Sequence, residues 1–313
     1  MITKRIFAVL FTAGFLSGCG LVPLEVTSEM LDAEGVDDTS LTDKTFRISS
    51  HPDVASFDRN RPVVICVHGY GACTYEWEEF RDFAAKDSLV YTSLVLMGGH
   101  GRDIEDFENS TWHDWQAPIM AEYDTVVKLG FKHISFASSS TGCALILEYM
   151  SRKAFDGKSV LPEKFFFIDP IVVSTNKLLT MASVVGPIIG NSPITNQTEL
   201  ELRHWYHNRP SSTLLQLNDA IEVIRAKLES GIKLPSGAYG KVYKSTDDGT
   251  ADPVSALLIY KGTTDDQGKN VDVEMVDSKL HVFTRVHGRA SPTTADTLLQ
   301  QRVFQEMIDK VTE

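Results

Sequence analysis

A group of small residues around Ser140 has the composition of a turn that exposes a nucleophile. The segment ISFASSSTG at 134–142 passes from an apolar stretch through small side chains into a helical pattern. Such a strand-to-helix turn is sharp and crowded, so small residues are needed two before and two after the nucleophile. Ser138 and Gly142 meet this need around Ser140, although the first position is usually glycine. Ser139 is the competing nucleophile, but it would put a β-branched threonine at a flank that should be small.

A glycine-rich turn upstream could supply hydrogen-bond donors. The apolar run 63–67 leads directly into HGYG at 68–71. A serine that attacks a carbonyl needs N–H groups aimed at the oxyanion, one from the residue after the nucleophile and one from a loop such as this. We therefore predict an oxyanion hole made by the backbone N–H groups of Tyr70 and Thr141. His68 is predicted to bond the backbone of the loop and not to act as the base.

The elements that must hold these residues alternate along the chain. Short runs rich in Val, Ile, Leu and Phe predict strands, most of them apolar enough to be covered on both faces. These runs are Val63–Val67, Leu94–Met97, Ile134–Ala137, Phe165–Ile168, Ala256–Tyr260 and Leu280–Val286. Helical patterns occupy Glu76–Lys86, Met120–Leu129, Thr141–Arg152 and Thr294–Val311. The alternation predicts an α/β fold in which a mainly parallel, twisted sheet carries helices on both faces.

The strand pattern stops between residues 170 and 253. This stretch opens with the apolar residues Leu178–Ile189 and continues with helix-like segments at Glu199–Trp205 and Ser212–Glu229. An insertion that follows a strand of a parallel sheet lies over the carboxyl ends of the strands, where ligands bind. We therefore predict a lid at about 170–253, whose apolar stretch either faces an acyl chain or packs on the core.

Four motifs in succession resemble one known family. They are VHGYG at 67–71, GHG at 99–101, WHDW at 112–115 and the serine turn. In this order they resemble the α/β-hydrolases grouped around monoacylglycerol lipases and small bacterial carboxylesterases, over nearly the whole chain that follows the N-terminal segment. The resemblance implies the α/β-hydrolase fold and a serine ester hydrolase. It also implies a catalytic serine, an acid after the next-to-last strand, a histidine after the last strand and a lid.

For the acid of the triad, the resemblance favours Asp265. The run Ala256–Tyr260 leads into KGTTDD at 261–266, and the spacing from Gly262 to Asp265 matches the family at that point. Asp266 is adjacent and stays an alternative. Asp169 is a second alternative, because it ends an earlier strand at a position where some hydrolases carry their acid.

For the base, the last predicted strand leads to His287 just before the terminal helix, whereas His281 lies inside the strand pattern. We therefore predict His287. The chain order Ser140, Asp265, His287 is the order of this fold. In such a triad His287 would take the Ser140 proton, and Asp265 would orient the imidazole ring and stabilise the imidazolium.

The N-terminus predicts export and a lipid anchor. Lys4 and Arg5 precede an apolar stretch at 6–16, which is too short to span a bilayer, since a spanning helix needs about 20 apolar residues. LSGC at 16–19 resembles the bacterial lipobox, which implies cleavage before Cys19 and acylation of that residue; a plain secretory signal is the alternative. We expect a signal peptide at 1–18 and an exported protein that is lipid-anchored through Cys19 to a bacterial cell membrane, inner or outer.

The charge balance argues against nucleic acid as a partner. The formal net charge is −12, and loss of 1–18 with its two positive charges makes it −14. Between Glu25 and Lys44 lie seven acidic residues and one basic residue, so we expect an acidic tether at 19–44. Residues 45–313 are then enough for one α/β domain that includes the lid.

Nothing in the sequence calls for a metal or a cofactor. The histidines lack further ligands at metal spacing, and no phosphate-binding loop is present. Besides Cys19 there are three cysteines, Cys66, Cys73 and Cys143, and a Cys73–Cys143 bridge is compatible with an oxidising compartment.

The substrate expected from these features is a small-molecule ester or lipid with a short or medium acyl chain, such as a monoacylglycerol. Two other functions stay open. An acyltransferase would share the serine turn but pass the acyl group to an acceptor other than water. A non-catalytic surface lipoprotein would use the same fold as a binding module, and Ser138 at the turn keeps this alternative open.

Overall fold

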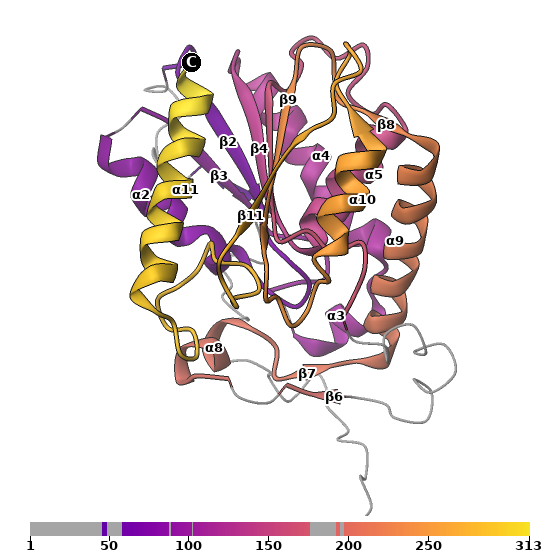
Figure 1. Cartoon of the computed structure of the whole chain (residues 1–313), viewed down its shortest axis with the longest axis vertical. Coiled ribbons are helices and arrows are strands. Elements are labelled where there is room, and N and C mark those ends of the chain that lie inside the picture. The colour runs from indigo at the N-terminus through magenta and orange to yellow at the C-terminus, as the bar shows by residue number, and fades with distance from the viewer. Residues whose placement is uncertain (1–45, 49–57, 88, 102, 176–191, 195–196) are drawn as a thin grey trace, which may run out of the picture.

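The computed structural model describes residues 46–48, 58–87, 89–101, 103–175, 192–194 and 197–313 (Figure 1). The predicted signal peptide, the acidic tether with Cys19, and the apolar stretch at 178–189 lie outside the described residues.

A seven-stranded sheet runs through the centre of the described domain, in the order β1-β3-β2-β4-β5-β9-β11. Only β1 is antiparallel to its neighbour, and the remaining pairs are parallel. The strands of this sheet are β1 (Phe46–Ile48), β2 (Val63–Val67), β3 (Tyr91–Val95), β4 (Ile134–Ser139), β5 (Lys164–Ile168), β9 (Tyr239–Ser245) and β11 (Asp272–Val276). The predicted fold class, a mainly parallel sheet with helices on both faces, is therefore confirmed.

Two layers of helices cover the sheet. The helices are α2 (Glu78–Asp87), α3 (Ile104–Asn109), α4 (Trp112–Lys128), α5 (Thr141–Ser151), α8 (Glu199–His204), α9 (Ser211–Ser230), α10 (Val254–Gly262) and α11 (Thr294–Thr312), and η2 (Thr74–Trp77) is a 3-10 turn. Figure 1 shows α2 and α11 on one face of the sheet and α4, α5, α9 and α10 on the other.

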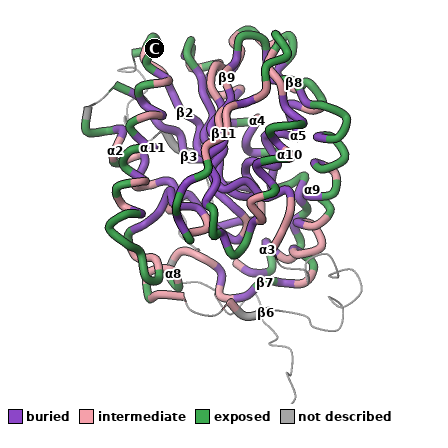
Figure 2. Tube along the Cα trace, in the orientation of Figure 1, coloured by how far each residue is buried: buried purple, intermediate pink, exposed green. Residues whose placement is uncertain are grey.

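Alternation along each strand divides the core between these layers. In β2, Val63, Ile65 and Val67 pack in the larger cluster with α4, α5 and α9. Val64 and Cys66 point the opposite way, into the cluster with α2 and α11. Successive side chains of a strand face opposite sides of the sheet, so a continuously apolar run is what a doubly covered strand needs. The buried centre of Figure 2 follows these strands.

Three strands of the sheet were not predicted: the short edge strand β1, and β9 and β11 in the C-terminal half. β9 falls inside the stretch 170–253, where it lies between β5 and β11, so that stretch is not one insertion. Its sequence, YGKVYKS, carries Lys241 and Lys244, which hide the apolar pattern. β11 has the sequence DVEMV and lies at the edge of the sheet, where alternation replaces a continuous apolar run.

Two of the predicted strands are not strands. The apolar run Ala256–Tyr260 belongs to helix α10, where Ala256 and Ile259 are buried while Leu257 and Tyr260 are exposed. A short apolar run suits a helix as well as a strand, and here the helix forms. The segment Leu280–Val286 has no regular structure. Its Val282 has a φ of 63° and donates its N–H to the carboxylate of Asp169, so that N–H does not serve a sheet ladder.

The described part of the cap is smaller than the predicted lid. It consists of the hairpin of β6 (Ser192–Pro193) with β7 (Asn208–Arg209) and of helix α8 between them, at the lower end of Figure 1. Helix α9 packs against α5 and α10 and is thus part of a covering layer. The short strand β8 (Ile232–Lys233) pairs with β10 (Thr263–Thr264) beside it.

Candidate active site

Ser140 occupies the sharp turn between β4 and α5. Its backbone has φ 47° and ψ −116°, a strained combination for a residue other than glycine. The strain is held by close packing: a Cβ on Gly142 would lie 2.7 Å from the carbonyl oxygen of His68 and 2.8 Å from that of Val67. Ser138, in place of the usual glycine, fits because its hydroxyl donates to the Phe166 carbonyl at 3.3 Å. The turn predicted around Ser140 is therefore present.

His281 and Asp248 complete a hydrogen-bonded row with Ser140. The Oγ of Ser140 lies 2.9 Å from Nε2 of His281, and Nδ1 of His281 lies 2.8 Å from Oδ2 of Asp248. An ionised carboxylate only accepts hydrogen bonds, so Nδ1 carries the ring proton and Nε2 is left as the acceptor for the serine hydroxyl. This is the arrangement in which a serine is activated by a histidine that an aspartate orients.

A buried lysine lies beside the aspartate of this row. Lys244 is fully buried, and its Nζ contacts Asp248 and also Asp169, the latter at 3.1 Å. Asp169 ends β5, and its carboxylate also accepts the N–H groups of Ser245 and Val282. Asp169 therefore anchors the His281 loop through the neighbouring Val282, but it does not bond the imidazole. It is a structural neighbour of the row and not its acid.

Charge and hydrogen bonding keep Asp248 ionised. Burial raises the pKa of this carboxyl, but the charge and hydrogen bond of His281 and then those of Lys244 outweigh burial and lower the pKa to about 2. The other oxygen of Asp248 accepts the N–H groups of Thr250 and Ala251 at 2.7 and 3.0 Å. The carboxylate is thus fixed on both oxygens and is available to orient His281 at neutral pH.

The predicted oxyanion donors lie at the same place. Thr141 is the first residue of α5, so its N–H has no partner within the helix. Tyr70 and Thr141 both line the cavity that contains Ser140. His68 lies behind this loop and holds it: its Nδ1 contacts the Gly69 carbonyl at 2.8 Å, and its Nε2 accepts the N–H of Met97 at 3.0 Å. Burial lowers the pKa of His68 to about 4, so the ring is neutral and serves the backbone, as predicted.

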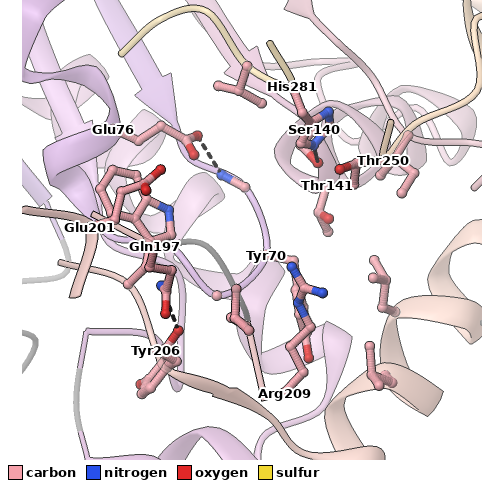
Figure 3. A pocket seen from close by; sticks show the side chains of 18 of the residues that line it. Tyr70, Glu76, Ser140, Thr141, Gln197, Glu201, Tyr206, Arg209, Thr250 and His281 are labelled. Atoms are coloured by element: carbon pink, nitrogen blue, oxygen red, sulfur yellow. Dashed lines mark hydrogen bonds between the residues drawn. The ribbon is translucent and has the colours of Figure 1, made fainter. Parts of the chain in front are cut away.

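Glu76 is a residue of the site that the sequence did not indicate. Its Oε1 accepts the N–H of Gly69 at 2.9 Å (Figure 3). The same oxygen accepts the hydroxyl of Ser139. Burial raises the pKa of this carboxyl, while the bonds to Ser139 and Gly69 lower it. The hydroxyl of Ser139, the alternative nucleophile, is thus bonded to Glu76 and not to His281, and Glu76 connects the serine turn to the glycine-rich loop.

Ser140 opens into a cavity of about 320 Å³, within the size range of small-molecule sites. The cavity is lined by Ser140, His281 and Thr141 from the sheet side and by residues of the cap, among them Trp205 and Arg209. Figure 3 shows the labelled side chains converging on it from these two sides. A substrate would therefore contact the nucleophile and the cap together.

Comparisons with known proteins agree on the fold. No family model matches the chain. A curated relative, the thermostable monoacylglycerol lipase of Bacillus sp. (strain H-257), is 26% identical over 233 residues, which are 73% of this chain and 86% of the relative. Among solved structures, one of metagenome-derived lipolytic enzymes superposes with a TM-score of 0.64 at 17% identity, covering 80% of this chain and 94% of the other. A monoglyceride lipase variant from Saccharomyces cerevisiae gives 0.65 at 8% identity, covering 85% and 89%. The chain has the α/β-hydrolase fold.

The structure does not bring the predicted acid and base to Ser140. Asp265 lies in a turn after β10, where its carboxylate accepts the N–H groups of Gln267 and Lys269. Asp266 is exposed and accepts the N–H of Gly237. His287 is exposed, and its N–H is donated to Glu79. The predictions of Asp265 as the acid and His287 as the base are therefore wrong. The residues that contact Ser140 in this way are His281 and, through it, Asp248.

The wrong choice of acid and the wrong choice of base both follow from strands that were predicted in the wrong places. KSTDD at 244–248 and KGTTD at 261–265 are nearly the same motif, with the aspartate four residues after the lysine in each. The elements before the two motifs distinguish them: β9, a strand of the central sheet, leads to Asp248, whereas helix α10 and the two-residue strand β10, outside that sheet, lead to Asp265. His281 seemed to lie inside a strand because LHVFTRV at 280–286 is largely apolar. Once β11 is recognised as the last strand, His281 is the first histidine after it.

The three described cysteines are separate thiols. Cys66, Cys73 and Cys143 are free and buried. The Sγ of Cys73 lies 3.3 Å from the His204 carbonyl, and the Sγ of Cys143 lies 3.2 Å from the Ser138 carbonyl. The Cys73–Cys143 bridge is therefore not formed. Among the described residues there is also no cluster of three or more potential metal ligands, and no helix long and apolar enough to cross a membrane.

Proposed function

We propose that this chain is an ester hydrolase in which Ser140, His281 and Asp248 form the catalytic triad. The observation that carries the proposal is the continuous contact from Ser140 Oγ to His281 Nε2 and from His281 Nδ1 to Asp248, at 2.9 and 2.8 Å. The relationship to a monoacylglycerol lipase supports the ester hydrolase class. The lipolytic enzymes and lipases among the structural neighbours share its fold.

The geometry supports acyl transfer to serine followed by hydrolysis. His281 takes the proton of Ser140 as its Oγ attacks the ester carbonyl, and the N–H groups of Tyr70 and Thr141 stabilise the oxyanion. The imidazolium returns the proton to the leaving alcohol, so the alcohol departs and an acyl-enzyme remains. Water, deprotonated by His281, then attacks the acyl carbonyl, and Ser140 regains its proton.

The substrate that fits best is an ester with a short or medium acyl chain on a small alcohol, such as a monoacylglycerol. A cavity of about 320 Å³ admits a ligand of this size. The monoacylglycerol portion of the proposal rests on the relative's activity. An acyltransferase would instead show acyl transfer to an added alcohol in preference to water, and a binding module would show neither reaction.

A matched set of variants tests the triad. We would express residues 20–313 as wild type, Ser140→Ala, Asp248→Asn and His281→Gln. Asp265→Asn and His287→Gln serve as controls, because both residues lie away from the cavity. Fluorophosphonate labelling and hydrolysis of p-nitrophenyl esters would be measured for each.

We expect Ser140→Ala to abolish labelling, and loss of either partner to lower kcat by about 10³-fold or more. The two controls should keep wild-type rates. Activity that survives Asp248→Asn and His281→Gln but is lost in Asp265→Asn and His287→Gln would overturn the assignment. A wild-type protein that neither labels nor hydrolyses any ester would favour the binding module.

We also propose that the domain is exported and held at a bacterial membrane through a lipidated Cys19. The support is the order of charge, apolar stretch, small residues and cysteine in the first nineteen residues. An enzyme held at a membrane surface would meet esters of lipid origin there.

A further inference from the structure

The cavity beside Ser140 contains a positive charge that no carboxylate of the described residues pairs with. Arg209, in strand β7 of the cap, lines the same cavity as Ser140 and Thr141. Figure 3 shows its guanidinium directed toward the part of the cavity that these two residues line. Within the described part of the chain Arg209 forms no ion pair, whereas the other arginine of the cavity, Arg289, is paired with Glu201 at 3.1 Å.

The acidic residues of the cavity are engaged elsewhere. Glu201 is held by Arg289, and Glu76 accepts bonds from Gly69 and Ser139 behind the serine turn. The charge of Arg209 instead acts on the phenol of Tyr70, whose pKa burial raises and this guanidinium lowers. The guanidinium therefore faces the space in which a substrate would lie.

A second polar group near Ser140 also lacks a partner. The Oγ1 of Thr141 is buried and has no hydrogen bond within the described structure. A buried hydroxyl without a partner destabilises the empty site, and a bound ligand that accepts its hydrogen bond removes that cost. Thr141 and Arg209 together thus offer a neutral and a charged donor to one cavity, and the nucleophile lies beside the first of them.

We propose that the natural substrate is an ester carrying an anionic group, a carboxylate or a phosphate, which Arg209 binds while the ester carbonyl lies at Ser140. This rests on the ester hydrolase function proposed above and names the substrate class of the same site. A guanidinium matches the planar, two-oxygen face of a carboxylate or phosphate and can donate two parallel hydrogen bonds to it. In a chain with a net charge of −12, the overall field repels an anion, so a local cation is needed to hold one.

The anionic group could lie on the acyl side or on the alcohol side of the ester, and matched substrates separate these cases. On the acyl side, mono-4-nitrophenyl glutarate is compared with 4-nitrophenyl valerate. On the alcohol side, 1-butyrylglycerol 3-phosphate is compared with 1-butyrylglycerol. Each pair would be measured with wild type, Arg209→Gln and Arg209→Lys, with Arg225→Gln as control because Arg225 is exposed on α9 and does not line the cavity.

We expect wild type to prefer the anionic member of at least one pair by about tenfold or more in kcat/KM, which is the scale of one charge-assisted contact. Arg209→Gln should abolish that preference by lowering kcat/KM for the anionic member more than for the neutral member, mainly through KM. Arg209→Lys should retain part of the preference, and Arg225→Gln all of it.

Two outcomes distinguish the two proposals. If wild type hydrolyses the neutral esters and prefers neither anionic partner, or if Arg209→Gln slows neutral and anionic esters alike, the anion-binding proposal is overturned and the hydrolase function stands. If wild type hydrolyses no ester and Ser140 is not labelled by a fluorophosphonate, the proposed function itself fails.

Discussion

Lys244 is the residue on which the charge balance of the site depends. It is fully buried and forms ion pairs with the carboxylates of both Asp169 and Asp248. Loss of the cation would leave two buried carboxylates side by side, and breaking a buried pair costs about 3–5 kcal/mol. The lysine therefore has a structural role at the end of β9 as well as an electrostatic effect on the triad.

A charge-balanced double variant tests this role. We expect Lys244→Met to lower the free energy of unfolding by about 3–5 kcal/mol and to reduce kcat. Lys244→Met combined with Asp169→Asn removes one charge of each sign and should recover a large part of the stability. Chemical denaturation of both variants measures this, and equal stability of the single and double variants would contradict it.

Because His68 is buried, we expect the free energy of unfolding to depend on pH. Its pKa in the folded protein is lowered to about 4 by burial, below the ordinary value of 6.5. The unfolded chain therefore binds this proton more strongly, and folding stability that is present above pH about 6.5 is lost as the pH falls toward 4. Between pH 7 and 5 the loss amounts to about 2 kcal/mol, since one pKa unit corresponds to about 1.4 kcal/mol.

Unfolding in urea at pH 7 and pH 5 measures this loss of stability. The matched control is His287→Gln, which should lose as much stability between the two pH values as the wild type. His68→Gln should show a smaller change between the two pH values. If that variant does not fold, NMR of the wild type decides instead, because the His68 ring signals should not titrate above pH 5. A His68 ring that titrates near pH 6.5 in the folded protein would contradict the argument.

At the scale of elements, the first half of the domain could be predicted from the sequence and the second half only in part. The runs that became β2, β4 and β5 are largely apolar because both faces of each strand are covered. β9 was missed because Lys244 is buried through ion pairs with residues distant in sequence, which no local pattern reveals. The same shift of elements moved the expected acid and base away from Asp248 and His281, whereas Ser140, set by local packing, was found.

Helix α10 offers a test of this reassignment. Leu257 is 47% exposed, whereas Ile259 is 0% exposed and packs in the core. We expect Leu257→Gln to change the free energy of unfolding by less than about 0.5 kcal/mol and Ile259→Ala to lower it by about 2–5 kcal/mol. Urea denaturation compares the two. In a doubly covered strand both residues would be buried, so a large loss in Leu257→Gln would favour the strand.

At the scale of the whole molecule, the proposed export signal and lipid anchor lie in the N-terminal segment. We expect full-length protein expressed in a bacterium to incorporate labelled palmitate and to sediment with membranes, because acylation of Cys19 and of the new N-terminus together gives stable anchoring. Cys19→Ser should abolish the label and release the protein from the membrane fraction, while Cys66→Ser keeps both. Label retained in Cys19→Ser would contradict the anchor.

The buried ion pairs of Lys244 also affect how the formal charge beside Ser140 changes in the proposed reaction. Asp169 and Asp248 both contact the one buried cation, Lys244, so in formal charges this group carries more acid than base beside the nucleophile. In the proposed reaction His281 takes the Ser140 proton and adds one positive charge next to Asp248. The same buried group therefore has a more even formal charge after the proposed proton transfer than before it.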